Sequence, residues 1–561
     1  MKNVAIVIAV LVCLPLLVDS RAKADGEVPE WQLLEVELKA EKEMANPYVD
    51  GLPDDGHPYV TVVFEGQNGE AKGKRYVVSG FCDGGQTWRT RFAPPVPGKW
   101  SYRSVSDDPG LNGKEGSFTC VGSSEAEKEA NPTRRGFVRV CRTGPRPGRH
   151  FEYADGTPFL WLGDTWWNWT KREIRFETFQ RLVDDRAAKG FNVGQLFFAA
   201  SGWSRSSSLL DETCNVPDLE HIRNAERMIA YANSKGITVW IHGWWSRRDM
   251  AEQVAPEKIA RWWRYVVHRL GAYNVIWVLA GEYNMWNYGG LGVEFWQDLG
   301  RMIDEEDAYE RIISVHPTPP GWQGGEEAPQ WSTADVLHQQ GWLDYNQSQT
   351  GHGKWRNELT PWVVRQAYQR EPAKPIVVTE PWYEFVEGNP PAADVRFGGW
   401  SAILFGAAGH SYGGGHVWRA HVPESPAGRG SWPLEEGFET DTLDYPGARS
   451  LSFMAKFLRS IDWWRLEPHP ELVLENPSQY CAAVPGKEYV AYLRWGGVAK
   501  VDLRPSSSDE EFAYEWIDLV KEEARTTGTV PGGDVRQFRP PEDYPGAPHY
   551  KDWILHIRKK Q

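Results

Sequence analysis

The chain has 561 residues, 41% of them hydrophobic and 25% charged, a composition typical of a globular protein with more than one domain. Its formal net charge of −14 argues against a nucleic-acid partner, which would require a basic face. Tryptophan is unusually frequent, with 30 residues. Tryptophan fills cores because it buries a large area, but its flat rings also stack on the apolar C–H faces of sugars, so the excess favours a carbohydrate ligand.

The first 24 residues have the pattern of a signal peptide. Lys2 supplies a positive charge, residues 4–18 are mostly apolar, and Ala22-Lys23-Ala24 forms a cleavage pattern before Asp25. The apolar run is too short for a membrane span, and no later stretch is long and uncharged enough. We therefore expect a protein without a membrane span that is exported to the periplasm or the extracellular space.

The cysteines indicate no metal or nucleophile chemistry. Five follow the predicted signal peptide, namely Cys82, Cys120, Cys141, Cys214 and Cys481. They show no metal-ligand spacing. Export permits disulfides, so Cys82 and Cys120 are a candidate pair within one small domain, and at least one cysteine stays unpaired in a monomer.

Residues 29–122 predict an N-terminal β-sandwich. Short alternating runs such as Tyr59–Phe64 and Lys74–Ser79 are separated by turn signals such as Gly84-Gly85, and no helical period appears. The polar segment Gly122–Pro132 predicts a linker.

Residues 135–461 alternate apolar runs with amphipathic helical runs, which predicts a (β/α)8 TIM barrel. The expected strands are Pro158–Leu162, Phe191–Phe198, Ile237–His242, Val275–Ala280, Ile312–His316, Leu343–Gln349, Pro375–Thr379 and Ile403–Ala408. Helix starts are indicated by Thr170-Lys-Arg-Glu173, which has the form of a capping box, by Ala255-Pro256 and by Thr360-Pro361. Residues 317–335 show no helical pattern and predict a long loop at the active-site end.

Residues 464–561 predict a second, C-terminal β-sandwich. The runs Tyr489–Trp495 and Val498–Leu503 flank Gly496-Gly497, which is a two-residue hairpin signal, and Asp552–Ile557 predicts a last strand. The sequence thus predicts a multi-domain chain with a central TIM barrel and a β-sandwich at each end.

Two glutamates stand where apolar strand runs end. Glu282 follows the fourth predicted strand and Glu380 the seventh. Because the chemistry of a TIM barrel lies at the carboxyl ends of its strands, we expect the two side chains at one rim. A carboxyl pair is what glycoside hydrolysis requires, with one group to protonate the leaving oxygen and one to attack the anomeric carbon or activate water. A single glutamate after a strand can also be merely solvated or cap a helix. The prediction of a catalytic site therefore depends on both glutamates together.

Other polar and aromatic side chains end the same strands and are candidates for substrate binding. The predicted hydroxyl-binding residues are Asp164, His242, Asn284, Gln349, His352 and Tyr412, and the predicted stacking residues are Trp166, Trp167 and Trp244. Asp164 has the alternative role of capping the turn into Thr165. The histidines His242, His352 and His416 match no metal-ligand motif, so neither a metal nor a cofactor is expected.

Several of these stretches resemble the apiosidase-like glycosidases with a DUF4038-type catalytic barrel. The similar stretches are Phe159–Trp167, Trp277–Glu282, Asp344–His352, Lys374–Pro381 and Ala408–Gly413. The N-terminal segment, with Phe92–Trp100, is similar to the DUF5060 β-sandwich, and the C-terminal segment resembles the collagen-binding-type β-sandwich of this group. The resemblance implies an acid/base at Glu282 and a nucleophile at Glu380. Members of the group tend to carry Asp in the motif that ends in Glu282, so the sugar or the linkage is expected to differ here.

The sequence therefore predicts a secreted glycoside hydrolase that cleaves a plant or algal polysaccharide or oligosaccharide by a two-carboxylate, retaining mechanism. One alternative is a non-catalytic carbohydrate-binding or adhesion protein on a degenerate barrel, against which the intact carboxyl pair argues. A hydrolase of another bond is the third alternative, and neither a Gly-x-Ser-x-Gly elbow nor an HExxH motif supports it.

Overall fold

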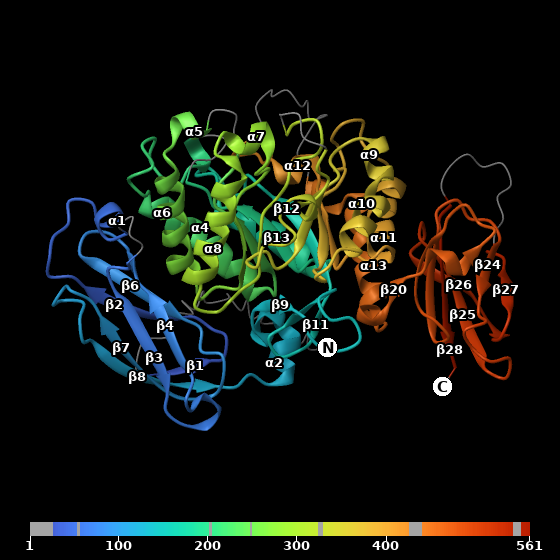
Figure 1. Ribbon diagram of the computed structural model, residues 1–561, viewed down its shortest axis with the longest axis horizontal. Coiled ribbons are helices and arrows are strands. Elements are labelled where there is room, and N and C mark those ends of the chain that lie inside the picture. The colour runs from blue at the N-terminus through green and yellow to red at the C-terminus, as the bar shows by residue number, and fades with distance from the viewer. Residues whose placement is uncertain are drawn as a thin grey trace, which may run out of the picture.

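The structure is a computed structural model that describes residues 26–52, 57–200, 205–246, 250–323, 329–425, 440–541 and 551–560. The predicted signal peptide, residues 1–24, lies outside the described residues. A central barrel is flanked by one β-domain on each side (Figure 1), which confirms the predicted multi-domain fold. No helix in the described part of the chain is long and apolar enough to cross a membrane.

The N-terminal domain consists of two packed sheets whose alternating strands bury one face each, as a sandwich requires. The five-stranded sheet has the order β1-β8-β7-β3-β4 and the three-stranded sheet β2-β6-β5. Their bounds are β1 Glu27–Pro29, β2 Leu34–Lys39, β3 Thr61–Gly66, β4 Arg75–Ser79, β5 Phe81–Cys82, β6 Thr87–Phe92, β7 Gly98–Val105 and β8 Glu115–Val121. The short helix α1 (Pro47–Asp50) lies in the loop after β2. Residues Phe64 and Phe92 stack between the sheets with ring centroids 4.2 Å apart.

The segment predicted as a linker is a helix, α2 (Glu125–Ala130). Ser124 and Glu127 form a capping box, in which the Ser124 hydroxyl accepts from the Glu127 backbone and the Glu127 carboxylate accepts from the Ser124 backbone. A small antiparallel sheet then follows, with the strands β9 (Val138–Val140), β10 (Phe151–Tyr153) and β11 (Pro158–Phe159). Local capping therefore overrides the polar, loop-like composition.

The barrel is a nearly closed parallel sheet of eight strands in the order β16-β15-β14-β13-β12-β19-β18-β17. The strands are β12 Trp161–Trp166, β13 Val193–Phe197, β14 Thr238–His242, β15 Val275–Val278, β16 Ile313–Ser314, β17 Asn346–Gln349, β18 Ile376–Glu380 and β19 Gly409–Tyr412. Between the two end strands the Asp344 N–H donates to the Ile313 carbonyl over 3.0 Å, which bridges the gap.

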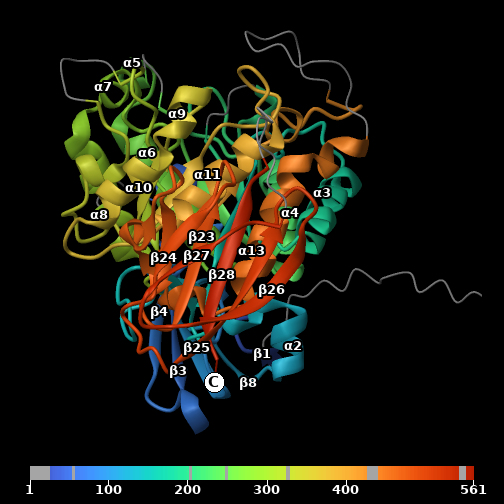
Figure 2. The same cartoon turned by 90° about the vertical axis from the view of Figure 1, so that its right-hand side faces the viewer.

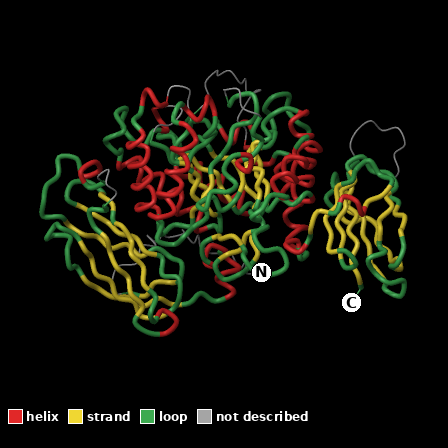
Figure 3. Tube along the Cα trace, viewed as in Figure 1, coloured by secondary structure: helices red, strands yellow, loops and turns green. Residues whose placement is uncertain are grey.

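Helices surround this sheet (Figure 3). Their bounds are α3 Phe176–Ala188, α4 Leu219–Ser234, α5 Met250–Gln253, α6 Pro256–Leu270, α7 Met285–Gly289, α8 Gly292–Glu306, α9 Lys354–Glu358, α10 Thr360–Tyr368, α11 Ala392–Leu404, α12 Gly415–Trp418 and α13 Pro446–Arg459. Helices α6 and α10 begin beside Pro256 and Pro361 as predicted. The predicted capping box at Thr170 is wrong, because α3 begins six residues later and the Thr170 hydroxyl donates to the Phe197 carbonyl instead.

Two predicted barrel strands are displaced. Pro158–Leu162 spans the end of the small sheet, and the first barrel strand, β12, runs on to Trp166. Ile403–Ala408 is mostly the end of helix α11, and the eighth strand begins at Gly409. Helix α11 is buried on all sides, because α13 and the C-terminal strands β22 and β23 cover its outer face, so its sequence lacks the helical period.

The C-terminal domain also has two sheets (Figure 2), in the orders β20-β22-β23-β28-β25-β26 and β21-β24-β27. The strands are β20 Glu467–Pro468, β21 Val473–Leu474, β22 Tyr480–Val484, β23 Glu488–Leu493, β24 Ala499–Asp502, β25 Glu511–Asp518, β26 Glu523–Pro531, β27 Val535–Phe538 and β28 Trp553–Lys559. The predicted Gly496-Gly497 hairpin is wrong, because β23 and β24 belong to different sheets. Both glycines have positive φ, 65° and 82°, and carry the chain from one sheet to the other.

The candidate disulfide between Cys82 and Cys120 does not form. All five described cysteines are free and buried. Burial raises the pKa of the Cys82 and Cys120 thiols to about 12, so both stay protonated and unreactive at neutral pH.

Candidate active site

Glu282 and Glu380 reach the same rim of the barrel. Glu380 is the last residue of β18, and Glu282 follows β15 after Gly281. At Gly281 a Cβ atom would lie 2.1 Å from the Trp245 ring, so only glycine lets that ring cover the end of β15. Glu282 itself has a left-handed backbone with φ of 48°, a strained conformation that surrounding structure must hold.

The environment of Glu282 favours its protonated form. Burial and the nearby negative charge of Glu380 raise the pKa of Glu282 well above the usual carboxyl range. The Thr318 hydroxyl and the Gln349 amide each lie 3.2 Å from its Oε1. Their hydrogen bonds lower the pKa of Glu282, but by less than burial and Glu380 raise it. Glu282 therefore holds a proton near neutral pH, as a general acid requires.

The environment of Glu380 favours its ionised form. Burial alone would raise the pKa of Glu380, but hydrogen bonds from two histidines outweigh it and lower the pKa far below the usual range. His316 Nε2 lies 3.0 Å from Oε2, and His352 Nε2 lies 3.4 Å from Oε1. The Tyr383 N–H lies 3.5 Å from His352 Nδ1, so Nδ1 is the acceptor. The ring proton of His352 is then on Nε2, from which it is donated to the Glu380 carboxylate.

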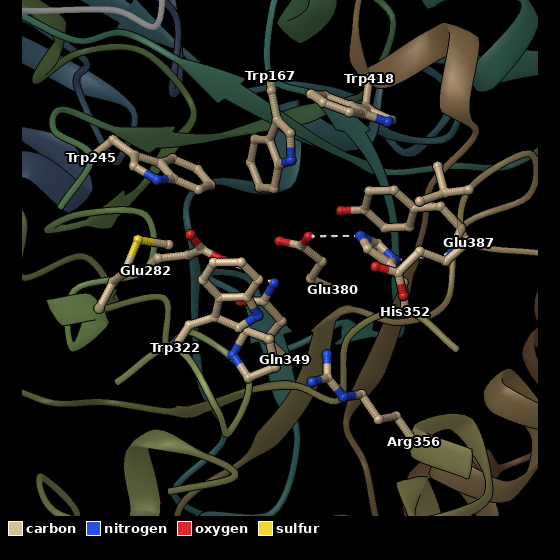
Figure 4. A pocket seen from close by; sticks show the side chains of 14 residues that line it. Trp167, Trp245, Glu282, Trp322, Gln349, His352, Arg356, Glu380, Glu387 and Trp418 are labelled. Carbon is tan, nitrogen blue, oxygen red and sulfur yellow. Dashed lines mark hydrogen bonds and ion pairs between the residues drawn. The ribbon is translucent and has the colours of Figure 1, made fainter. Parts of the chain in front are cut away.

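Both glutamates face one cavity of about 250 Å³ (Figure 4). Aromatic side chains form most of its wall, and Figure 4 shows the two carboxyl groups pointing toward each other beneath them. The lining residues are Trp167, Trp245, Glu282, Met285, Pro319, Trp322, Gln349, His352, Arg356, Glu380, Tyr383, Val386, Glu387 and Trp418. An aromatic wall with few convergent polar groups is the usual form of a small-molecule site.

Three of the predicted binding residues line this cavity, namely Trp167, Gln349 and His352. His242 points into the barrel but lies beneath the cavity, fully buried among the rings of Trp167, Trp240 and Trp245. Asn284 is also buried, and it accepts a hydrogen bond of 2.8 Å from the Thr318 N–H. Asn284 thus positions the loop that carries Thr318.

The other four predicted binding residues lie outside the cavity, and the alternation of side chains along the chain explains this. Asp164 and Trp166 point outward from β12, where Asp164 accepts from Arg186 over 2.6 Å, while Thr165 and Trp167 point inward. Trp244 packs in the outer core, and Trp245 faces the cavity in its place. The Tyr412 hydroxyl is buried and donates to Glu384 over 2.7 Å.

His316 and most of the aromatic wall are not predicted from the sequence. His316 ends a predicted strand, as Glu282 and Glu380 do, so the same criterion would have found it. Trp245 and Tyr383 each follow a predicted strand end within four residues. Trp322, Arg356 and Trp418 come from long loops and short helices that no local pattern connects to the site.

No group of three or more metal-ligating side chains is found among the described residues. His416, one of the three histidines considered for a metal, instead lies 2.6 Å from the Tyr445 hydroxyl. The chemistry that the cavity supports is that of its two carboxyl groups, one protonated and one ionised.

A barrel with such a pair at the ends of its fourth and seventh strands carries the two groups that glycoside hydrolysis requires. The family model "Apiosidase-like, catalytic domain" matches residues 146–465, and the model of the DUF5060 domain matches residues 27–107. The chain belongs to the apiosidase-like family.

Solved structures share this fold at low sequence identity. A glycoside hydrolase family 5 protein from Bacteroides vulgatus is 19% identical with a TM-score of 0.64, and covers 76% of this chain and 94% of its own. A second protein from Bacteroides vulgatus, described as a candidate glycoside hydrolase, is 17% identical with a TM-score of 0.68, and covers 96% of this chain and 100% of its own. A comparison with curated proteins found no match.

Proposed function

We propose that the protein cleaves a glycosidic bond in a plant or algal polysaccharide by a retaining mechanism. The observation that carries the proposal is that the two glutamates share one cavity but have different partners. Two histidines contact Glu380, whereas Glu282 is buried beside its charge, so the two pKa values shift in opposite directions. Environments that separate the pKa values of two neighbouring acids assign their roles as acid and base.

In this mechanism Glu282 gives its proton to the glycosidic oxygen as the bond breaks. Glu380 attacks the anomeric carbon and forms a glycosyl-enzyme ester, and the leaving sugar departs as an alcohol. Glu282, now ionised, removes a proton from water, which attacks the same carbon and releases Glu380. The histidines keep Glu380 ionised and fixed for attack, and the aromatic wall supports sugar rings.

We propose that a glycosidic bond is cleaved, but not that the sugar released is apiose. The resemblance to the apiosidase-like proteins implies an Asp at this position, and Glu282 reaches one methylene further than an Asp would. The added reach moves the acid toward the opposite carboxylate or toward a differently placed leaving oxygen, which supports a different sugar or linkage.

The catalytic pair is tested on a glycan found by screening defined plant and algal polysaccharides. We expect Glu380→Gln to lower kcat by about 10³-fold or more on every substrate. Glu282→Gln should lower kcat by about 10²–10⁴-fold on the glycan, but much less on an aryl glycoside whose leaving group needs no proton.

The control is Glu177→Gln, an exposed residue of α3, which should retain wild-type rates. Nuclear magnetic resonance of the first product tests retention, since the released sugar must keep the anomeric configuration of the substrate. Wild-type rates in both glutamate variants, or an inverted first product, would refute the corresponding part of the proposal.

We also propose that the protein is exported. The pattern of residues 1–24 supports this, and amino-terminal sequencing of protein recovered outside the cytoplasm should begin at Asp25. Recovery of an uncut chain only in the cytoplasm would contradict it.

A further inference from the structure

Four tryptophans in the described part of the chain are exposed to solvent. The exposed fractions are 46% for Trp322, 59% for Trp355, 46% for Trp362 and 51% for Trp495. Exposed tryptophans that gather in one region mark binding surfaces, because their burial in a complex removes a large apolar area from water. We call these four residues the tryptophan track.

Two members of the track are held in place by a fifth tryptophan. The half-buried ring of Trp331 contacts Trp355 and Trp362, with ring centroids 6.2 Å apart in both pairs. The planes meet at 85° and 88°, so the contacts are edge-to-face. Rings fixed in this way lose little conformational freedom when a ligand binds.

The track is continuous with the catalytic cavity. Trp322 lines the cavity, and so does Arg356, whose guanidinium lies 5.2 Å from the centre of the Trp355 ring. Arg356 Nη2 also donates to the Pro320 carbonyl over 3.2 Å, which connects helix α9 to the loop that carries Trp322. Figure 4 shows Trp322 and Arg356 together at one edge of the cavity.

At its other end the track reaches the C-terminal domain. Arg494 contacts the Trp495 ring, with Cζ 4.8 Å from the ring centre, and donates to Glu358 over 2.8 Å. Glu358 lies one turn after Trp355 on α9. Figure 1 shows α9 and α10 on the side of the barrel that faces the C-terminal sandwich. Contacts through Arg494 and Glu358 therefore link Trp495 of the second domain to the helix that carries Trp355.

We propose that the tryptophan track binds sugar units of a glycan chain that continues beyond the catalytic cavity. The proposal rests on the proposed function and deepens it, because the substrate becomes a long chain and not a small glycoside. Separate flat rings with exposed polar residues such as Lys354 and Glu358 beside them suit successive sugar rings, which are apolar on their faces and polar at their edges. Continuity with the cavity identifies the occupant as the same chain.

The test compares the wild type with the double variant Trp355→Ala/Trp362→Ala on a glycan that the wild type cleaves. Measurements of kcat/KM are made on the polymer and on the shortest fragment that is still cleaved. We expect kcat/KM of the double variant to fall about tenfold on the polymer and less than about twofold on the fragment. Trp355→Phe/Trp362→Phe should recover most of the loss, and Val216→Ala, an exposed apolar residue outside the track, should change neither value.

An equal loss on polymer and fragment, or no loss on the polymer, overturns the proposal. Thermal unfolding should show that the variants remain folded, with a Tm only slightly below that of the wild type, because the alanine variant loses only the edge contacts with Trp331. If light scattering instead shows a dimer that the double variant loses, the track is a contact between copies of the chain and the proposal is wrong.

Binding is measured as well, so that the track is tested even if no glycan is cleaved. The wild type and the double variant are run in native gels that contain soluble arabinoxylan, xyloglucan, galactomannan or homogalacturonan. Retardation of the wild type that the double variant loses supports the track, whether or not the glycan is cleaved. Equal retardation of both proteins, or none of the wild type, contradicts it, whereas absence of cleavage alone contradicts only the proposed function.

Discussion

At the scale of single residues, the protonation of the two glutamates depends on their neighbours and not on their identity. Both are carboxyl groups at strand ends of one barrel, yet the pKa of Glu282 is raised and that of Glu380 is lowered. Burial acts on both in the same direction, so the difference comes from the neighbours: His316 and His352 lower the pKa of Glu380, and the negative charge of Glu380 raises the pKa of Glu282. The proposed mechanism at neutral pH requires an ionised Glu380 and a protonated Glu282.

The histidines can be tested through the pH dependence of kcat/KM. A carboxyl group whose pKa is lowered stays ionised further into acid, so activity should be lost on the acidic side only as pH falls through that lowered value. His316→Gln removes part of the cause, and we expect the acidic limb to move to higher pH by about one unit.

His338→Gln is the matched control, because His338 is buried but bonds to Asn346 and Pro372. Its pH profile should equal that of the wild type. An unmoved acidic limb in His316→Gln, with the protein folded by circular dichroism, would show that His316 does not control Glu380.

At the scale of elements, the pleat of β12 decides which of its side chains serve the site. Trp167 and Thr165 point into the barrel, whereas Asp164 and Trp166 point toward helix α3. Asp164 accepts hydrogen bonds from Arg186, from the Trp166 indole over 2.9 Å and from the Thr165 N–H over 2.9 Å. Both of its oxygens accept hydrogen bonds within the fold, so Asp164 joins the first strand to the first helix of the barrel.

We therefore expect Asp164→Ala to lower the free energy of unfolding by about 3–5 kcal/mol, because it leaves the buried Arg186 without this partner. Urea unfolding measures the loss, and KM of the folded fraction should change little. Asp184→Asn, an exposed site on the same helix, should change stability by less than about 1 kcal/mol. A raised KM with unchanged stability would instead support the predicted role of Asp164 in substrate binding.

At the scale of the whole molecule, buried charge pairs join both β-domains to the barrel. On one side Glu226 of α4 pairs with Arg269 of α6 over 2.8 Å and with Arg91 of the N-terminal β6. On the other side Arg396 of α11 donates two hydrogen bonds to Asp552, over 2.9 and 2.8 Å. Buried pairs of this kind fix the register of the surfaces that they join, because a displaced partner would leave a charge unpaired.

A variant at Glu226 tests the connection between the N-terminal domain and the barrel. Burial raises its pKa, but attraction to Arg269 and Arg91 is stronger, and the pKa is lowered from 4.5 to about 2. A lowered pKa stabilises the fold above the unfolded value, and this stabilisation is lost as pH falls from 4.5 toward 2. Glu226→Gln should lower the free energy of unfolding by about 3–5 kcal/mol at pH 7, with a smaller difference from the wild type near pH 3.

Urea unfolding at the two pH values measures this, and Glu220→Gln, exposed on the same helix, is the control. A difference that is the same at both pH values would mean that the charge of Glu226 does not hold the domains together.

The sequence by itself determined the order of the domains, the parallel barrel, and the positions of Glu282 and Glu380. These depend on local patterns, namely apolar runs of strand length and the residue that ends each run. It did not reveal helix α11 or the separation of β23 from β24, because the C-terminal domain buries α11 on every side and takes β23 and β24 into different sheets. Only the tertiary structure decided which rim residues enter the cavity, since that depends on the pleat of each strand and on loops distant in sequence. The same packing decided the protonation of the two glutamates, because His316 and His352 come from other strands than Glu380.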